Sequence, residues 1–69
     1  MSRPTNKVEI VRLTYGVFVV TVFDLFGREV RVRQSPRFST EPRRREWALK
    51  QARQYSETFG VWFDERIYN

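Results

Sequence analysis

Residues 17–34, VFVVTVFDLFGREVRVRQ, decide the fold that this sequence predicts. Residues 17–24 are mainly β-branched and aromatic, which favours a β-strand. Asp24 and Gly27 occupy the first and fourth positions of DLFG, which fits a type I turn with a left-handed glycine bulge. A further strand follows over residues 28–34. The stretch therefore predicts a β-hairpin whose register is fixed by its turn.

Outside this hairpin, the pattern predicts one strand before it and a helix and a strand after it. Residues 8–14, VEIVRLT, predict a strand that a two-residue turn at Tyr15 and Gly16 joins to the hairpin. Residues 61–68, VWFDERIY, alternate enough to form a last strand. We expect an α+β fold of the order βββαβ: a three-stranded antiparallel meander, one helix packed on one face, and a short fourth C-terminal strand.

The helix has recognisable ends. Thr40 or Ser39 is a suitable N-cap, and Pro42 is tolerated in the first turn because its missing N–H has no helical partner there. Gly60 fits a left-handed C-cap. Apolar residues recur at helical spacing between these ends, and they predict a stripe that covers one sheet face. The stripe consists of Ala48, Leu49, Ala52, Tyr55 and Phe59.

The two predicted turns assign residues to the faces of the meander. They pair Val22 with Val30 and Leu13 with Phe18. The side facing the helix then receives Val11, Leu13, Phe18, Val20, Val22, Val30 and Val32. The opposite side receives Val8, Ile10, Val17, Val19 and Phe23, interleaved with Arg12, Thr14, Thr21, Glu29, Arg31 and Arg33. Trp62 and Tyr68 join this second side in one phase of the last strand.

The second side has no cover in the predicted fold, because the single helix is committed to the first. Contiguous apolar area rimmed by charge is typical of an interface. We expect Val17, Val19 and Phe23 to bind another protein or a second copy of the chain, which would form a homodimer through the sheet. The alternative is that the N-terminal arm or the last strand folds over part of this side.

Length and composition limit the functions open to this chain. Its 69 residues predict one domain over residues 8–69, after a flexible N-terminal arm at residues 1–7. It has neither cysteine nor histidine, which argues against disulfides, thiolate metal sites and the commonest general base. We expect no catalytic residues, metal or cofactor. No apolar run approaches the ~20 residues of a membrane span, so we expect a cytoplasmic protein without a membrane partner.

A basic patch is the second candidate site. The net charge is +5, and three arginines open the helix in EPRRREW, where cations are unfavourable by ~0.3–1 kcal/mol each. Ion pairs spaced i,i+4 are one explanation, and they would join Glu41 with Arg45, Glu46 with Lys50 and Arg53 with Glu57. They do not explain Arg43, Arg44 and Trp47, which lies near Arg43 and Lys50 on the side away from the apolar stripe. We expect these residues, with Lys50, Arg31 and Arg33, to contact an acidic partner.

Two resemblances suggest what the partner is. Strand order and the hairpin GVFVVTVFDLFGR, residues 16–28, resemble the arm-binding domains of phage integrases and the plant AP2-type domain. That resemblance implies a nucleic-acid partner, with the sheet in the major groove and Arg12, Arg31 and Arg33 on its contact face. The apolar residues on the same side favour a drier partner than a DNA groove.

The second resemblance is to small phage inhibitors. MSRPT at residues 1–5, followed by the predicted strands, one helix and a closing strand, resembles type I anti-CRISPR proteins that bind subunits of the Cascade complex. The strand order is also similar to that of the small phage inhibitor of bacterial RNA polymerase. These resemblances imply stoichiometric binding to a host protein or nucleoprotein complex in the infected bacterium. The basic charge argues for occlusion of a surface rather than for DNA mimicry.

Overall fold

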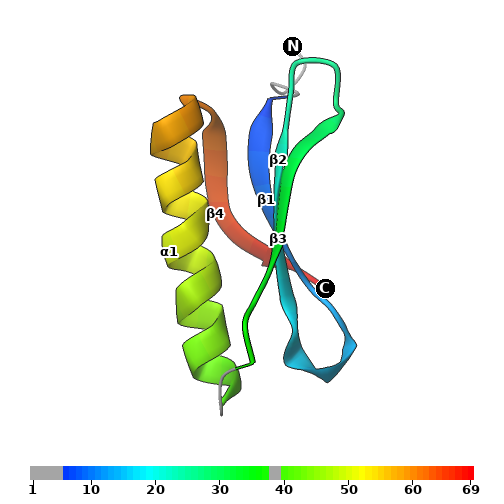
Figure 1. The fold of residues 1–69 in the computed structure, drawn as a ribbon, viewed down its shortest axis with the longest axis vertical. Helices are drawn as coiled ribbons and strands as arrows, with labels where there is room; N and C mark the ends of the chain where they lie inside the picture. The colour runs from blue at the N-terminus through cyan, green and yellow to red at the C-terminus, as the bar shows by residue number, and fades with distance from the viewer. Residues whose placement is uncertain (1–5, 38–39) are drawn as a thin grey trace.

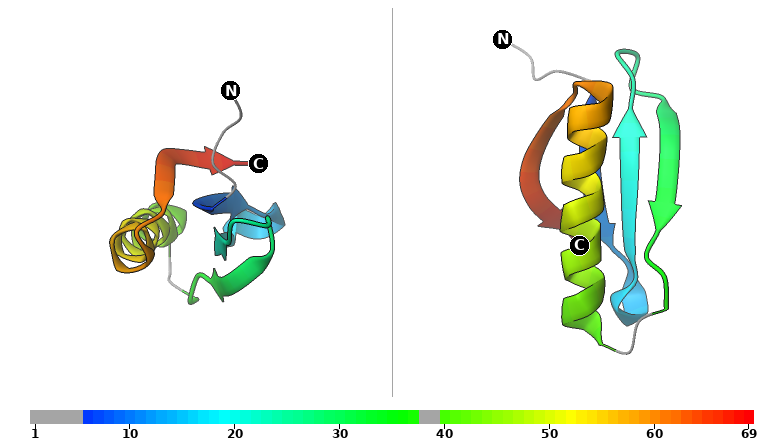
Figure 2. Two further views of the ribbon diagram at one scale, coloured as in Figure 1. Left: turned by 90° about the horizontal axis from the view of Figure 1, so that it is seen from above. Right: turned by 60° about the vertical axis from the view of Figure 1, so that its left-hand side comes forward.

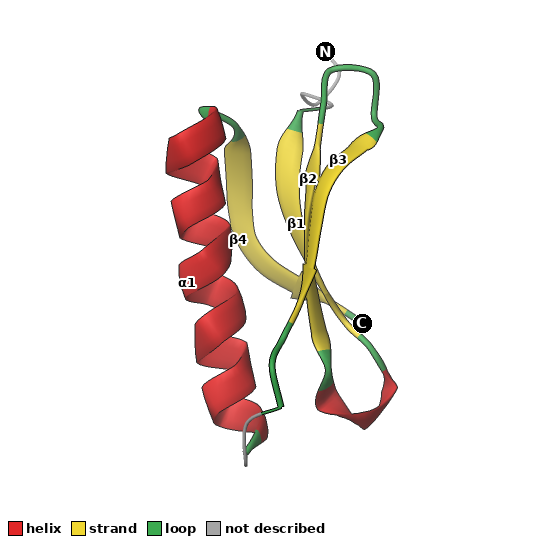
Figure 3. Ribbon diagram, viewed as in Figure 1, coloured by secondary structure: helices red, strands yellow, loops and turns green. Residues whose placement is uncertain are grey.

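A computed structural model describes residues 6–37 and 40–69. Its elements are β1 (Lys7–Arg12), the 3-10 turn η1 (Thr14–Gly16), β2 (Phe18–Phe23), β3 (Glu29–Gln34), α1 (Glu41–Phe59) and β4 (Trp62–Tyr68) (Figures 1 and 3). The predicted βββαβ order and the α+β class are confirmed. Most of the predicted arm and Ser39 lie outside the described residues, and Lys7 already belongs to β1.

The four strands form one mixed sheet in the order β3-β2-β1-β4. β2 is antiparallel to both of its neighbours, whereas β4 runs parallel to β1, so the last strand joins the sheet at the edge opposite β3. Figure 2 shows α1 along one side of the sheet, roughly aligned with the strands. The helix contacts mainly β1, β2 and β4, so the edge strand β3 extends past its cover.

The core lies between α1 and the two central strands. Five large side chains of β1 and β2 are almost completely buried there, and small alanines let the helix approach them closely. Burial of apolar surface of this kind supplies most of the stability of a small domain. The buried hydrophobic residues are Val8, Ile10, Phe18, Val20, Val22, Ala48, Ala52 and Tyr55.

The helix ends are close to those that the sequence predicts. Thr40 takes the N-cap position with extended backbone but makes no side-chain capping bond, and Pro42 lies in the first turn. Gly60 adopts φ 64° and donates its N–H to the Ser56 carbonyl. On the predicted apolar stripe, Phe59 is 42% exposed, because it lies at the helix end, beyond the strands that bury Tyr55.

The predicted register between β1 and β2 is wrong by one residue. The connection is the three-residue η1 rather than a two-residue turn: the Leu13 N–H donates to the Val17 carbonyl at 2.7 Å. Tyr15 adopts a left-handed φ of 70°, which side chains other than glycine rarely do. The sequence pattern gives no reason to expect this geometry at a tyrosine.

One residue of register exchanges the two faces of β1. Ile10 lies opposite Val20, and Val11 lies opposite Val19. Val8 and Ile10, which we predicted on the uncovered side, therefore belong to the core, and Val11 takes their place on the uncovered side. Leu13, predicted under the helix, is 45% exposed.

A bulge makes the predicted faces of β3 wrong as well. The predicted turn is present, with the Asp24 N–H donating to the Arg28 carbonyl at 2.9 Å. The register then shifts between Val22 and Phe23, so Val22 pairs with Arg31 instead of Val30. Beyond this bulge Val32 lies beside Thr21, and the arginines of β3 lie on the helix side.

Candidate binding surfaces

The sheet side away from α1, called here the reverse face, carries apolar residues from every strand. The pairings place on it Val11, Val19, Phe23, Val32, Trp62 and Tyr68. Val32 and Trp62 are 53% and 42% exposed, and the others are partly buried. No element of the described residues covers this face (Figure 2).

Polar groups divide the reverse face into two apolar ends. Lys7 and Glu9 form an ion pair at 3.4 Å, and the Lys7 ammonium lies 5.7 Å from the centre of the Phe23 ring. Thr21 lies opposite Glu9 and, along β2, between Phe23 and Val19, and it is 6% exposed. Of the predicted residues, Val19 and Phe23 lie on this face, and Val17 continues the alternation just before β2, partly buried.

Arg31 and Arg33 do not share the reverse face, contrary to the prediction. The guanidinium of Arg33 lies 5.8 Å from the centre of the Trp47 ring, and it donates to Gln51 Oε1 at 3.3 Å. The guanidinium of Arg31 lies 6.0 Å from the centre of the Phe59 ring. Both arginines thus reach from β3 towards the helix, where α1 leaves the strand uncovered.

The prediction that Trp47 lies on the side of α1 away from the core is wrong. Trp47 is partly buried and packs against the core. With Arg43, Glu46 and Lys50 it lines a surface depression of about 290 Å³, called here the basic groove. The structure therefore brings together Arg33, Arg43, Trp47 and Lys50, and it separates them from the apolar residues of the reverse face.

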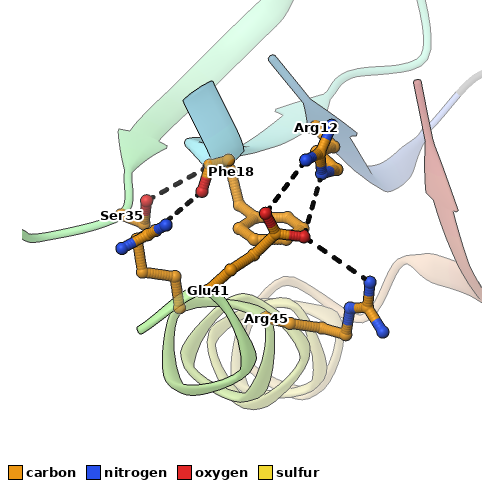
Figure 4. Close-up of polar contacts among 7 residues, drawn as sticks. Arg12, Phe18, Ser35, Glu41 and Arg45 are labelled. Atoms are coloured by element: carbon orange, nitrogen blue, oxygen red, sulfur yellow. Dashed lines mark hydrogen bonds and ion pairs between the residues drawn. The ribbon is translucent and has the colours of Figure 1, made fainter. Parts of the chain in front are cut away.

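Arg44 and Arg45 at the start of α1, and Arg12 at the end of β1, have intramolecular contacts that explain their position. Arg12 donates to Glu41 through Nη2 at 2.9 Å and Nε at 3.1 Å, and Arg45 lies 3.8 Å from the same carboxylate (Figure 4). Arg44 donates from Nε to the Gly16 carbonyl at 2.7 Å. Arg12 at the end of β1 and Arg44 in α1 tie the start of the helix to the turn between β1 and β2, whereas Arg45 pairs within the helix. A partner is therefore not needed to account for Arg44.

The arginines around Glu41 stabilise its charged form. The bond from Arg12 lowers the pKa of Glu41, with a further contribution from Arg45, and it raises the pKa of Arg12. At the other end of the helix, Arg53 does not pair with Glu57 but donates to Glu65 of β4 at 2.9 Å, which lowers the pKa of Glu65. Both pairs join the helix to a strand.

A third exposed apolar surface, at the β2–β3 turn, is not among the predicted sites. At the β2–β3 turn, Leu25 is 67% exposed and Phe26 is 79% exposed, and Val30 nearby is 52% exposed. Beside them lies a depression of about 330 Å³, called here the hairpin groove. The signal was present in the sequence: a DLFG turn needs its aspartate and glycine, but it gives no reason for two large apolar residues between them.

Asp24 is engaged by the hairpin turn, where its carboxylate accepts hydrogen bonds from the Phe26 and Arg28 N–H groups. The Arg28 bond is the main cause of its lowered pKa. Within residues 6–37 and 40–69, no three histidine, cysteine, aspartate or glutamate side chains are grouped to hold a metal ion, and no helix is long and apolar enough to cross a membrane.

Comparison of the chain with protein-family models, with curated proteins and with solved structures finds no match.

Proposed function

We propose that this protein is a non-enzymatic binding module that acts by stoichiometric contact with another protein through the reverse face. The observation that carries the proposal is the side-chain exposure on an uncovered sheet: Val32 and Trp62 are about half exposed, beside partly buried Val11, Val19 and Phe23. Complete burial of a large apolar side chain is worth ~1.5–3 kcal/mol, so a partner that covers this face gains substantial binding energy.

The finer proposal is a small phage-type inhibitor of a host complex, with a Cascade subunit as one target. It is supported by the resemblance at residues 1–5 and by the βββαβ order. The net charge of +5 favours occlusion of a protein surface or a nucleic-acid path over imitation of DNA. The cytoplasm of a bacterial host is the compartment that this proposal implies.

Capture experiments with surface variants test the proposal. Tagged wild-type protein, Val32→Glu and Trp62→Glu are compared as baits for purified host complexes, Cascade among them, and Gln54→Ala on the exposed helix surface serves as the control. We expect the wild type and the control to retain one partner at a fixed ratio and both reverse-face variants to lose it. Equal capture by all four proteins would contradict the proposal.

A homodimer is a separate form of the same proposal. Two copies related by a two-fold axis would cover each other's reverse face. Sedimentation of the wild type and of Val32→Glu distinguishes this case. A wild-type dimer that Val32→Glu converts to monomer identifies a second copy as the partner, whereas a monomeric wild type leaves the face to another protein.

Nucleic-acid binding is the alternative, and the basic groove favours it. Arg33, Arg43 and Lys50 gather around Trp47 on the helix side of the sheet. The form of this alternative that resembles integrase arm-binding domains is weakened, because Arg12 is paired with Glu41 and both β3 arginines lie away from the reverse face. Titration with duplex DNA tests it: log K should fall with log salt by about 0.9 per phosphate contacted, and Arg43→Ala with Lys50→Ala should reduce that slope.

A further inference from the structure

The tip of the β2–β3 hairpin exposes two apolar residues that the turn does not require. Asp24 Oδ1 accepts from the Phe26 N–H at 2.8 Å and the Arg28 N–H at 2.9 Å, and Gly27 adopts φ 76°. These contacts use backbone groups and the Asp24 carboxylate. They do not involve the side chains of Leu25 and Phe26, which are 67% and 79% exposed.

Behind this tip, several elements together line the hairpin groove. Its walls come from Asn6 before β1, the end of β2, the turn, the start of β3, the end of α1 and the residue before β4. The apolar side chains among them are Val22, Phe23, Leu25, Phe26, Val30, Phe59 and Val61. A concave apolar site of about 330 Å³ is at the small end of the range for ligand pockets, and it suits one or two large side chains.

Positive charge surrounds this apolar surface. A cation lies over each of the three phenylalanine rings: Arg28 over Phe26 at 5.3 Å, Lys7 over Phe23 at 5.7 Å and Arg31 over Phe59 at 6.0 Å. Two carboxylates accompany these cations: Asp24 lies 3.7 Å from Arg28, and Glu9 lies 3.4 Å from Lys7, so the three cations outnumber these two carboxylates. The groove is therefore apolar at its centre and cationic at its edge.

We propose that the hairpin groove binds a segment of a protein partner in which one or two large apolar side chains are flanked by aspartate or glutamate. The inference rests on the proposed protein-binding function and names a second contact surface for it. The apolar side chains fill the groove, and the acidic flanks pair with Arg28 and Arg31. A membrane surface would also attract cations and aromatic rings, but a concave site accepts a projecting side chain, which a bilayer does not present.

Peptide selection tests this chemistry on the intact protein. A library of random 12-residue peptides is selected against the wild type, and an enriched peptide is then synthesised and titrated by calorimetry. We expect enriched sequences that carry Phe, Leu or Trp beside acidic residues. Phe26→Ser and Arg28→Glu, both at exposed positions outside the core, should each weaken the peptide at least about tenfold. Gln54→Ala, exposed on α1 and not among the groove-lining residues, is the matched control and should leave the affinity unchanged.

Several results would overturn the inference. It fails if no peptide is enriched, if enriched peptides lack acidic flanks, or if their affinity is the same for Phe26→Ser and Arg28→Glu as for the wild type. It also fails if the wild type binds phosphatidylglycerol vesicles but no peptide. The proposed function fails separately, when Val32→Glu and Trp62→Glu capture partners as well as the wild type does. The two proposals can therefore be rejected independently.

Discussion

The helix side and the reverse face draw on the same strands, yet they provide different environments. In β2, Phe18, Val20 and Val22 are at most 1% exposed, while the alternating apolar residues Val19 and Phe23 are only partly buried. Both sets are large and apolar, so residue type does not separate them. The helix separates them, because it covers one side only.

This contrast shows what each side contributes. The helix side supplies the stability of the domain, and its residues are constrained by close packing. The reverse face supplies little of it within the monomer, so its apolar residues are available for a contact outside the chain. Substitutions on the helix side should therefore destabilise the fold, whereas substitutions on the reverse face should change partner binding.

The largest expected effect separates neighbouring residues of β1. Ile10→Ala should lower the free energy of unfolding by about 2–5 kcal/mol, because Ile10 is completely buried. Val11→Ala, on the partly exposed reverse face, should cost about 1 kcal/mol or less. Urea denaturation followed by circular dichroism measures both. Equal losses, or a larger loss for Val11, would mean that the register between β1 and β2 is the one that the sequence alone predicted.

The sequence predicts the elements better than their faces. The turn at Asp24 and Gly27 and the helix stop at Gly60 follow from residue chemistry, and the structure contains both. The face of β1 does not follow, because Val8 and Ile10 on one side and Val11 and Leu13 on the other are equally apolar. The length of the turn at Tyr15 sets the register and so decides which of the two pairs faces the helix.

The faces of β3 could not be predicted for a different reason. Burial normally selects the register of a strand, but every residue of β3 is exposed, since α1 lies over the neighbouring strands. The assumption that Val32 faces the helix therefore had no energetic basis. The unpredicted register of β3 also explains why the basic groove could not be predicted. It places Arg33 beside Trp47 on the helix side, so this charge is absent from the reverse face.

A second comparison concerns the turns at the two ends of β2. Gly16 and Gly27 both have positive φ, but a Cβ on Gly16 would lie 2.6 Å from Glu41 Oε1 and 2.9 Å from an Arg44 nitrogen. A Cβ on Gly27 would meet nothing within 4 Å. Gly27→Ala should therefore cost about 1–2 kcal/mol from backbone strain alone, and Gly16→Ala should cost more than that because it also displaces Glu41 and Arg44.

Thermal unfolding of the two glycine variants measures this difference. Gly16→Ala combined with Glu41→Ala is the informative control, since removal of the carboxylate relieves part of the collision. The double variant should then lose less stability than the sum of the single variants. Strict additivity would show that the Glu41 carboxylate does not limit the space at Gly16.

The smallest expected effect is the pH dependence of the Arg12–Glu41 pair. Arg12 lowers the pKa of Glu41 below its ordinary value of 4.5, so the folded state holds the carboxylate in its charged form more strongly than the unfolded chain does. The stabilisation is complete above that ordinary value and is lost as the pH falls through the lower pKa of the folded state. Glu41→Gln should be less stable than the wild type at pH 7, and the difference should shrink as the pH falls below 4.5.

The comparison must be between variants, because Asp24, Asp64 and Glu65 also have lowered pKa values and destabilise the wild type in acid with the same sign. Glu57→Gln, on the exposed surface of α1, serves as the control for the loss of one carboxylate. Melting temperatures of the three proteins between pH 7 and pH 3 should converge for Glu41→Gln and stay parallel for Glu57→Gln. Parallel curves for both variants would mean that the Arg12–Glu41 pair is too exposed to stabilise the turn. The bond from Arg44 to the Gly16 carbonyl would then be the remaining contact between the helix start and the turn.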